Sequence, residues 1–140
     1  MDLIDTLNIS GAGLNSQRVR LQTISSNMAN ARTTRTAEGG HYLRRVPVLE
    51  STELDPFGSA LDQAMASVDV AEIATTGQEG NRVYEPGHPD ADADGFVTYP
   101  EIDILREMVD LMTASRSYEA NATAADTTKQ LALRALEIGR

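Results

Sequence analysis

The chain has 140 residues, a formal net charge of −9 and no cysteine. The acidic excess argues against duplex nucleic acid or an acidic membrane surface as a partner, and the lack of cysteine excludes disulfide bonds, thiolate metal sites and cysteine nucleophiles. Leu, Ile, Val and Phe make up only about a fifth of the residues, so we expect part of the chain to bury its apolar surface against a partner.

The amino terminus lacks the basic flank and the unbroken apolar run of a cleaved secretory signal. No stretch of the sequence is apolar enough over a sufficient length to span a membrane. If the protein leaves the cytoplasm, we expect a route that does not cleave a conventional signal.

Proline and glycine are distributed unevenly. All five prolines lie in the middle of the chain, and neither residue type occurs between Gly13 and Gly39 or between Pro100 and Gly139. Because both residues disrupt helices, this distribution predicts a long helix at each end.

Charge divides the chain in the same way. The net charge is +2 over residues 1–35, −9 over residues 36–100 and −2 over residues 101–140. We therefore predict a mainly α fold. Two long terminal helices with heptad seams, similar to those of coiled coils, would form an N-terminal and a C-terminal assembly segment. A small β-rich subdomain with an acidic turn would lie between them.

The first helix carries apolar residues at heptad spacing. One row consists of Leu7, Leu14, Leu21 and Met28, and the second row consists of Leu3, Ser10, Gln17, Ile24 and Ala31. Gly11 and Gly13 lower helix propensity. We therefore expect a break or a late-ordering turn over residues 8–13 and a regular helix over residues 14–30.

The middle of the chain contains several short strand patterns. Residues 42–49 alternate in the manner of a strand, which Pro47 would restrict to a sheet edge. Residues 68–73 and 82–84, joined by a glycine-containing turn, predict a hairpin. Residues 57–66 are interpreted as a short helix or loop.

An acidic run fits the calcium loop pattern D-x-D-x-D-G-x5-E. Its carboxylates are Asp90, Asp92, Asp94 and Glu101. An EF-hand needs an entering helix, however, and the two prolines in residues 85–89 prevent one. The favoured interpretation is a tight acidic turn, in which Asp side chains accept hydrogen bonds from backbone amides and Gly95 has a positive φ. A calcium site remains the alternative.

The second helix also carries a heptad pattern, sustained over residues 101–138. One row consists of Ile104, Leu111, Tyr118, Ala125 and Ala132, and the other consists of Met108, Ser115, Ala122, Lys129 and Leu136. Pro100 suits a helix start and Gly139 a C-cap.

Two interpretations of these seams are open. The helices can pair within the chain or lie on a globular core, or they can pack against other chains. A basic face on the first helix, formed by Arg18, Arg20, Arg32 and Arg35, is either solvated or paired with an acidic neighbour.

Residues that could support catalysis are scarce. The chain has two histidines, His41 and His88, and both lie in glycine- or proline-flanked segments. It has no G-x-S-x-G, P-loop or H-E-x-x-H motif. We therefore expect no enzyme, no cofactor and no small-molecule substrate.

Two segments resemble a known family. Residues 9–31 contain an apolar, Ser-rich lead, the pair Arg20-Leu21 and then Asn27-Met-Ala-Asn30, and they resemble the amino-terminal signature of the bacterial flagellar rod and hook family. Residues 112–121, MTASRSYEAN, resemble its carboxy-terminal signature. Residues 82–95 and the end of the chain are similar to a short member of the proximal rod.

The resemblance implies an axial structural subunit of the periplasm-spanning rod of the basal body. Its terminal helices would pack with other rod subunits and basal-body components into a helical hetero-oligomer that transmits torque. It would be exported by the flagellar type III machinery without a cleaved signal. A heterologous contact that does not close into a ring produces a filament of this kind.

Ten residues are the candidates for subunit contacts. They are Leu14, Leu21, Ile24, Asn27, Met28, Asn30, Met108, Leu111, Tyr118 and Asn121. We expect the three asparagines to hydrogen-bond across helices and so fix register, as single polar residues do in coiled coils. The alternative is that they are exposed helix surface.

Overall fold

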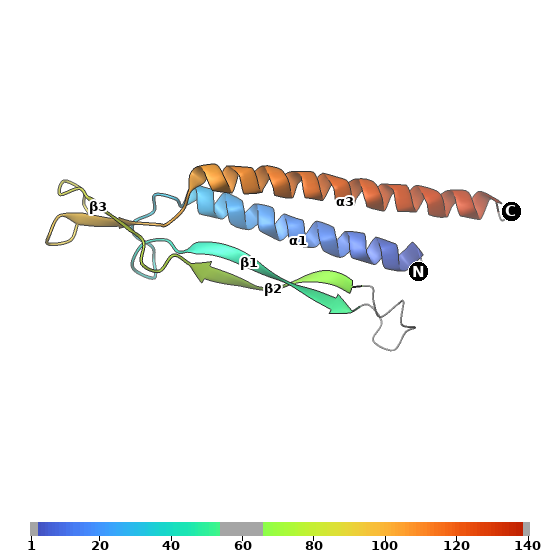
Figure 1. The fold of residues 1–140 in the computed structure, drawn as a ribbon, viewed down its shortest axis with the longest axis horizontal. Coiled ribbons are helices and arrows are strands. Elements are labelled where there is room, and N and C mark those ends of the chain that lie inside the picture. Colours follow the sequence, from blue (N-terminus) through green and yellow to red (C-terminus); the bar gives the residue numbers. More distant parts are fainter. Residues whose placement is uncertain (1–2, 54–65, 139–140) are drawn as a thin grey trace.

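The computed structural model describes residues 3–53 and 66–138. In chain order its elements are α1 (Leu3–Ala29), β1 (Arg44–Glu53), β2 (Ala66–Thr76), β3 (Asn81–Tyr84), β4 (Phe96–Tyr99) and α3 (Ile104–Ile138). Helix α1 lies between α3 on one side and the β1–β2 ribbon on the other (Figure 1). Two long terminal helices with antiparallel strands between them confirm the predicted fold class.

Helix α1 is continuous through both glycines, so the break predicted over residues 8–13 is wrong. Gly13 is buried, and a Cβ atom at this position would lie 2.8 Å from Nδ2 of Asn121 on α3. The missing side chain therefore lets α3 approach closely, and this tertiary packing overrides the weak helix propensity of glycine. The helix ends at Ala29, close to the predicted end.

Helices α1 and α3 run antiparallel, so that both chain termini lie at the same end of the molecule (Figure 1). The buried residues of α1 and α3 are mostly small or polar. They are Ser10, Gly13, Ser16, Thr23, Ile24 and Asn27 on α1, and Glu107 and Ala114 on α3. The inner contact of the helix pair therefore buries little apolar area per turn.

Helix α3 begins at Ile104 rather than at residue 101. Asp103 is its N-cap, because its Oδ1 accepts hydrogen bonds from the amides of Leu105 at 2.9 Å and of Arg106 at 3.3 Å. Three residues thus separate Pro100 from the helix. The predicted C-cap, Gly139, lies outside the described residues.

The strands form two separate antiparallel ribbons, β1–β2 and β3–β4. The strand predicted over residues 42–49 is confirmed as the first part of β1, and Pro47 lies on an edge because the sheet has two strands. The hairpin predicted between residues 68–73 and 82–84 is wrong. Strand β2 instead makes ten residue pairs with β1, far more than the short β3 could offer. Of residues 57–66, all but the last lie outside the described residues.

The apolar core is small. Among the described residues, the buried apolar side chains are Ile24, Tyr42, Val97 and Ala114. None of the described helices is both long and apolar enough to cross a bilayer. The low content of large apolar residues is thus reflected in the structure, in which polar groups occupy much of the interior.

Candidate functional site

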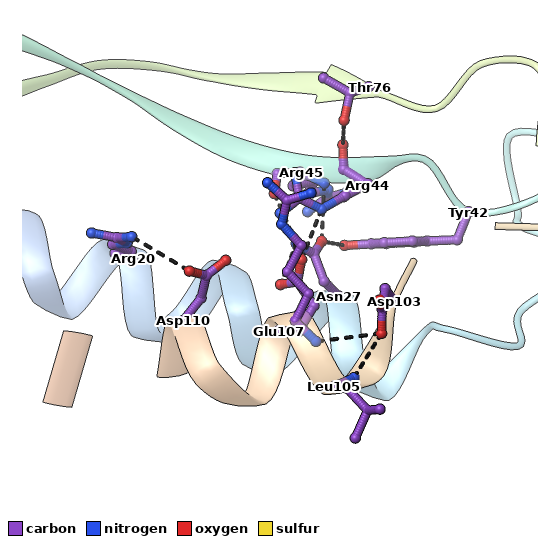
Figure 2. A network of polar contacts seen from close by, with 11 residues as sticks. Arg20, Asn27, Tyr42, Arg44, Arg45, Thr76, Asp103, Leu105, Glu107 and Asp110 are labelled. Carbon is purple, nitrogen blue, oxygen red and sulfur yellow. Dashed lines mark hydrogen bonds and ion pairs between the residues drawn. The ribbon is translucent and has the colours of Figure 1, made fainter. Parts of the chain in front are cut away.

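A buried polar cluster lies where α1, β1 and α3 meet (Figure 2). At its centre is Asn27 of α1, which is 1% exposed. Its Nδ2 donates to the carbonyl oxygen of Arg45 at 2.8 Å and to Oε2 of Glu107 at 3.3 Å. Its Oδ1 accepts from the amide of Arg45 at 2.9 Å and from the Tyr42 hydroxyl at 3.2 Å. Both donor hydrogens and both acceptor positions of the side-chain amide are therefore used.

Glu107 of α3 supplies the charge in this cluster and is also 1% exposed. Its Oε1 accepts from Nε of Arg44 at 2.8 Å and lies 2.6 Å from Nη2 of the same guanidinium. Arg44 is the first residue of β1, so the ion pair joins the ribbon to α3. Since an unpaired buried carboxylate is strongly unfavourable, this pairing makes the burial of Glu107 possible.

The three asparagines selected from the sequence have different surroundings. Asn27 bonds across elements, as described above. Asn30 instead donates to the carbonyl of Ser26 at 2.9 Å and accepts from the Thr33 hydroxyl at 3.1 Å, and both of these hydrogen bonds are local. Asn121 is partly exposed and faces Gly13 across the helix contact.

Sequence reasoning missed Tyr42 and Glu107 as partners of Asn27, and Arg44 as the partner of Glu107. The available signal was the spacing of Glu107, Ala114 and Asn121, which repeat every seven residues one position before the predicted row. This row, of which Glu107 and Ala114 are fully buried, faces α1. It was overlooked because its residues are charged, small or polar rather than apolar.

The opposite face of α3 is apolar and exposed. Leu105, Val109 and Met112 are 74%, 62% and 57% exposed, and Met108 lies beside them at the spacing of one helix face. At 100° per residue, this face is opposite to Glu107 and Ala114. The apolar side chains of this part of α3 therefore point away from the chain's own helix contact.

A second exposed apolar region lies where α3 extends beyond the first residues of α1 (Figure 1). Leu131, Leu133 and Leu136 of α3 are exposed here. Ile4, the second residue of α1, is exposed as well. Leu131 and Leu133 point to nearly opposite sides of α3, since two residues correspond to about 200°. A helix that is apolar on several sides is typical of burial by more than one neighbour.

The other interface candidates fall into three groups by exposure. Ile24 is buried within the chain, and Leu14, Leu21, Met28 and Leu111 are half-buried. Met108 and Tyr118 are exposed. The structure therefore gives the first heptad row of α1 partial cover and leaves the side chains of α3 more open.

The acidic turn between β3 and β4 is held by Asp92. Its Oδ1 accepts from the amides of Asp94 at 3.0 Å and of Phe96 at 2.8 Å, and its Oδ2 lies 2.6 Å from Nη2 of Arg82. The hydrogen bond from Phe96, followed by the contact with Arg82, lowers the pKa of Asp92 below its ordinary value. Gly95 has a φ of 82°, as the tight-turn interpretation predicts.

This geometry does not support the calcium alternative. Asp90 accepts from the Thr34 hydroxyl at 2.8 Å and pairs with Arg35, while Glu101 lies against Gly77. In the described part of the chain, no group of three or more His, Cys, Asp or Glu residues is placed to hold a metal ion. The carboxylates of Asp90 and Asp92 instead have separate structural partners.

A groove of about 620 Å³ lies between the end of the β1–β2 ribbon and the start of α3. Charges of both signs line it, from Arg44, Arg106, Glu101 and Asp103. The described lining contains no Ser, Cys or His.

Comparisons with known proteins relate the chain to one group. Residues 93–138 match the family described as flagellar basal body rod FlgEFG protein C-terminal. The chain is 41% identical to the flagellar basal-body rod protein FlgC of Bacillus subtilis and 36% identical to that of Salmonella typhimurium, with both chains fully covered in each case. It is 38% identical to that of Aquifex aeolicus, over 98% of this chain and 97% of the relative.

Proposed function

Because the chain belongs to the family of the flagellar basal-body rod protein FlgC, we propose that its two terminal helices pack against neighbouring rod subunits and transmit torque through these contacts. Members of this family are structural proteins of the basal-body rod, in agreement with the prediction that the chain is not an enzyme. The chain is accordingly a structural component of the flagellar basal body.

The observation that carries this proposal is the apolar outer face of α3. Leu105, Val109 and Met112 are more than half exposed and lie together on one helix face. Exposed apolar patches of this kind mark interaction surfaces. A neighbouring helix packed along this face would remove the three side chains from water. Because the apolar core of the single chain is small, such additional burial of apolar surface would stabilise the subunit.

The far end of the helix pair supports the same proposal. The end of α3 carries Leu131, Leu133 and Leu136 on different sides. A single neighbour could not cover all of them, so each subunit would contact at least two others. Contacts between unlike faces that repeat along an axis generate a filament, which is the arrangement that a torque-bearing rod requires.

The route to the rod is part of the proposal. The chain would pass through the flagellar type III machinery without cleavage of a signal and would assemble in the periplasm with other rod subunits. Mass spectrometry of the protein taken from purified basal bodies tests this step: an intact amino-terminal segment is expected, and a processed one would contradict it.

The packing proposal is tested by Val109→Asp. A charge on the outer face of α3 opposes burial against a neighbour, so we expect loss of motility and absence of the chain from detergent-stripped basal bodies, while the circular dichroism of the isolated chain stays unchanged. Gln78→Asp, at an exposed polar position outside both helices, is the control. Normal motility in Val109→Asp would contradict the proposed contact.

A further inference from the structure

The buried cluster of Asn27, Arg44 and Glu107 connects three elements that are far apart in the sequence (Figure 2). Asn27 comes from α1, Arg44 from β1 and Glu107 from α3, and both Asn27 and Glu107 are 1% exposed. We infer that this cluster sets the register of α1, β1 and α3, and that it does so without adding to the stability of the chain.

The remainder of the helix contact offers little that could define a register. Apart from Ile24, its buried positions include Ser10, Gly13 and Ser16 on α1 and Ala114 on α3, and such small side chains do not interlock as large ones do. If α3 slipped by seven residues toward its carboxyl end, Ala114 would take the place of Asn121 opposite Gly13. Small side chains would still meet along the contact, so packing alone discriminates weakly between the two registers.

The polar cluster, in contrast, permits one register. A slip of seven residues moves Glu107 by about 10 Å along α3. That distance separates its carboxylate from the Arg44 guanidinium, now at 2.6 Å, and from the Asn27 amide, now at 3.3 Å. Since Asn27 uses all of its hydrogen-bonding positions in the present arrangement, the slipped register leaves a buried charge and a buried amide without these partners.

Stability does not require the cluster. Desolvation of the buried Glu107 carboxylate, paired with an Arg44 side chain that is 28% exposed, offsets much of their attraction, and well-packed apolar replacements of a buried ion pair are often neutral or stabilising. Buried polar groups fix register in some helical assemblies. Asn27, Arg44 and Glu107 are therefore positioning residues, whose removal as a set changes which register is populated.

The test uses disulfide trapping in the full chain, which has no native cysteine. A Cβ atom at Gly13 would lie 3.2 Å from Cγ of Asn121, so Gly13→Cys with Asn121→Cys reports the observed register. Gly13→Cys with Ala114→Cys, and Gly13→Cys with Thr128→Cys, report slips of seven residues in either direction. Each pair is oxidised in the background of the natural cluster and of a variant with an apolar cluster.

The apolar variant carries Asn27→Leu, Arg44→Met and Glu107→Leu. With the natural cluster, we expect only the first pair to cross-link efficiently. In the apolar variant, we expect at least one slipped pair to cross-link to a comparable extent, with the midpoint of thermal unfolding unchanged or raised. The control replaces a partly exposed ion pair between the same helices, Arg20 and Asp110 at 3.9 Å, by Arg20→Met and Asp110→Leu, and should retain the native register.

Two results would overturn the inference. If the apolar variant cross-links only through the Asn121 position, packing sets the register. If it unfolds or melts well below the natural chain, the cluster supplies stability, contrary to the inference. Neither result depends on motility or on rod assembly, so the test stands apart from the proposed function.

Discussion

The close approach of α3 to Gly13 can be tested with two glycines of the same helix. Gly11 and Gly13 both lie inside α1, and replacement of a helical glycine by alanine stabilises a helix by about 0.5–1 kcal/mol. A Cβ atom at Gly11 would meet nothing within 4 Å, whereas one at Gly13 would lie 2.8 Å from Nδ2 and 3.2 Å from Cγ of Asn121. The two substitutions therefore share a gain in helix propensity and differ in the contact with α3.

For Gly11→Ala we expect the free energy of unfolding to rise by about 0.5–1 kcal/mol. For Gly13→Ala the Asn121 side chain must move out of its present position, and an off-rotamer side chain costs roughly 0.5–1.5 kcal/mol. The two terms nearly cancel, so we expect Gly13→Ala to be about 1 kcal/mol less stable than Gly11→Ala, as the combination of these estimates implies.

Urea unfolding followed by circular dichroism measures both values on the isolated chain. In an Asn121→Ala background the contact is absent, so there Gly13→Ala should recover the full gain of Gly11→Ala, and the double-mutant cycle should yield a coupling of about 1 kcal/mol. Equal effects of the two glycine substitutions in the natural background, with no coupling to Asn121, would refute the close approach. Absence of any effect at either position would refute a continuous α1 in the isolated chain.

Three further outcomes are expected. Asp103→Ala removes the N-cap of α3 and should lower the free energy of unfolding by about 1 kcal/mol, whereas Asp103→Asn, which keeps the acceptor, should not; urea unfolding distinguishes them. The pKa of Asp92 is lowered in the folded state. The stabilisation that its ionised carboxylate gives to the fold is therefore present above the ordinary pKa of 3.8 and is lost as the pH falls through the lowered pKa. Acidification should therefore shift the Phe96 amide resonance, and a shift that persists in Asp92→Asn would contradict this assignment. Gly95→Ala should disrupt the β3–β4 turn, since Gly95 has a φ of 82°; unchanged amide spectra of this ribbon would count against the required conformation.

Much of the architecture could be predicted because it depends on local signals. The absence of proline and glycine over long stretches predicts both terminal helices, and the Asp–Gly composition of residues 90–95 predicts the acidic turn. The strand containing Pro47 was found for the same reason, since alternation and the position of proline are visible in a short window.

The predictions were wrong where the local structure depends on contacts with an element that is distant in the sequence. The predicted break near Gly13 assumed that helix propensity acts alone, but α3 covers that position. The predicted hairpin joined two strands that are adjacent in the sequence, whereas β2 pairs with β1, and no local pattern reports this pairing. Glu107 was overlooked because a charged residue at a buried position can be recognised only together with its partner Arg44, 63 residues away.

The helix pair has its polar groups inside and its apolar groups outside, contrary to a two-stranded coiled coil. Its inner contact contains Asn27, Glu107 and small residues. We infer that this contact defines the register of α1 and α3, although it buries little apolar area. The outer face of α3 carries Leu105, Val109 and Met112, which are 57% to 74% exposed. Full burial of an exposed apolar side chain is worth about 1.5–3 kcal/mol, and about two thirds of each of these three is still exposed, so their complete burial in an assembly would contribute roughly 3–6 kcal/mol.

The placement of polar residues at the inner helix contact and of apolar residues on the outer face of α3 affects how subunits would assemble. In the proposed assembly, the apolar contribution would become available only when a neighbour covers α3, so we expect a single subunit to be less stable than an assembled one. The geometry presented to that neighbour would already be determined by the inner polar contact, if this contact sets the register as inferred above. Conditions that weaken apolar association, such as low concentrations of urea, should therefore dissociate subunits before they change the register of α1 and α3. Cross-linking of Gly13→Cys with Asn121→Cys in partly dissociated basal bodies would measure the order of the two events, and loss of this cross-link before dissociation would contradict the argument.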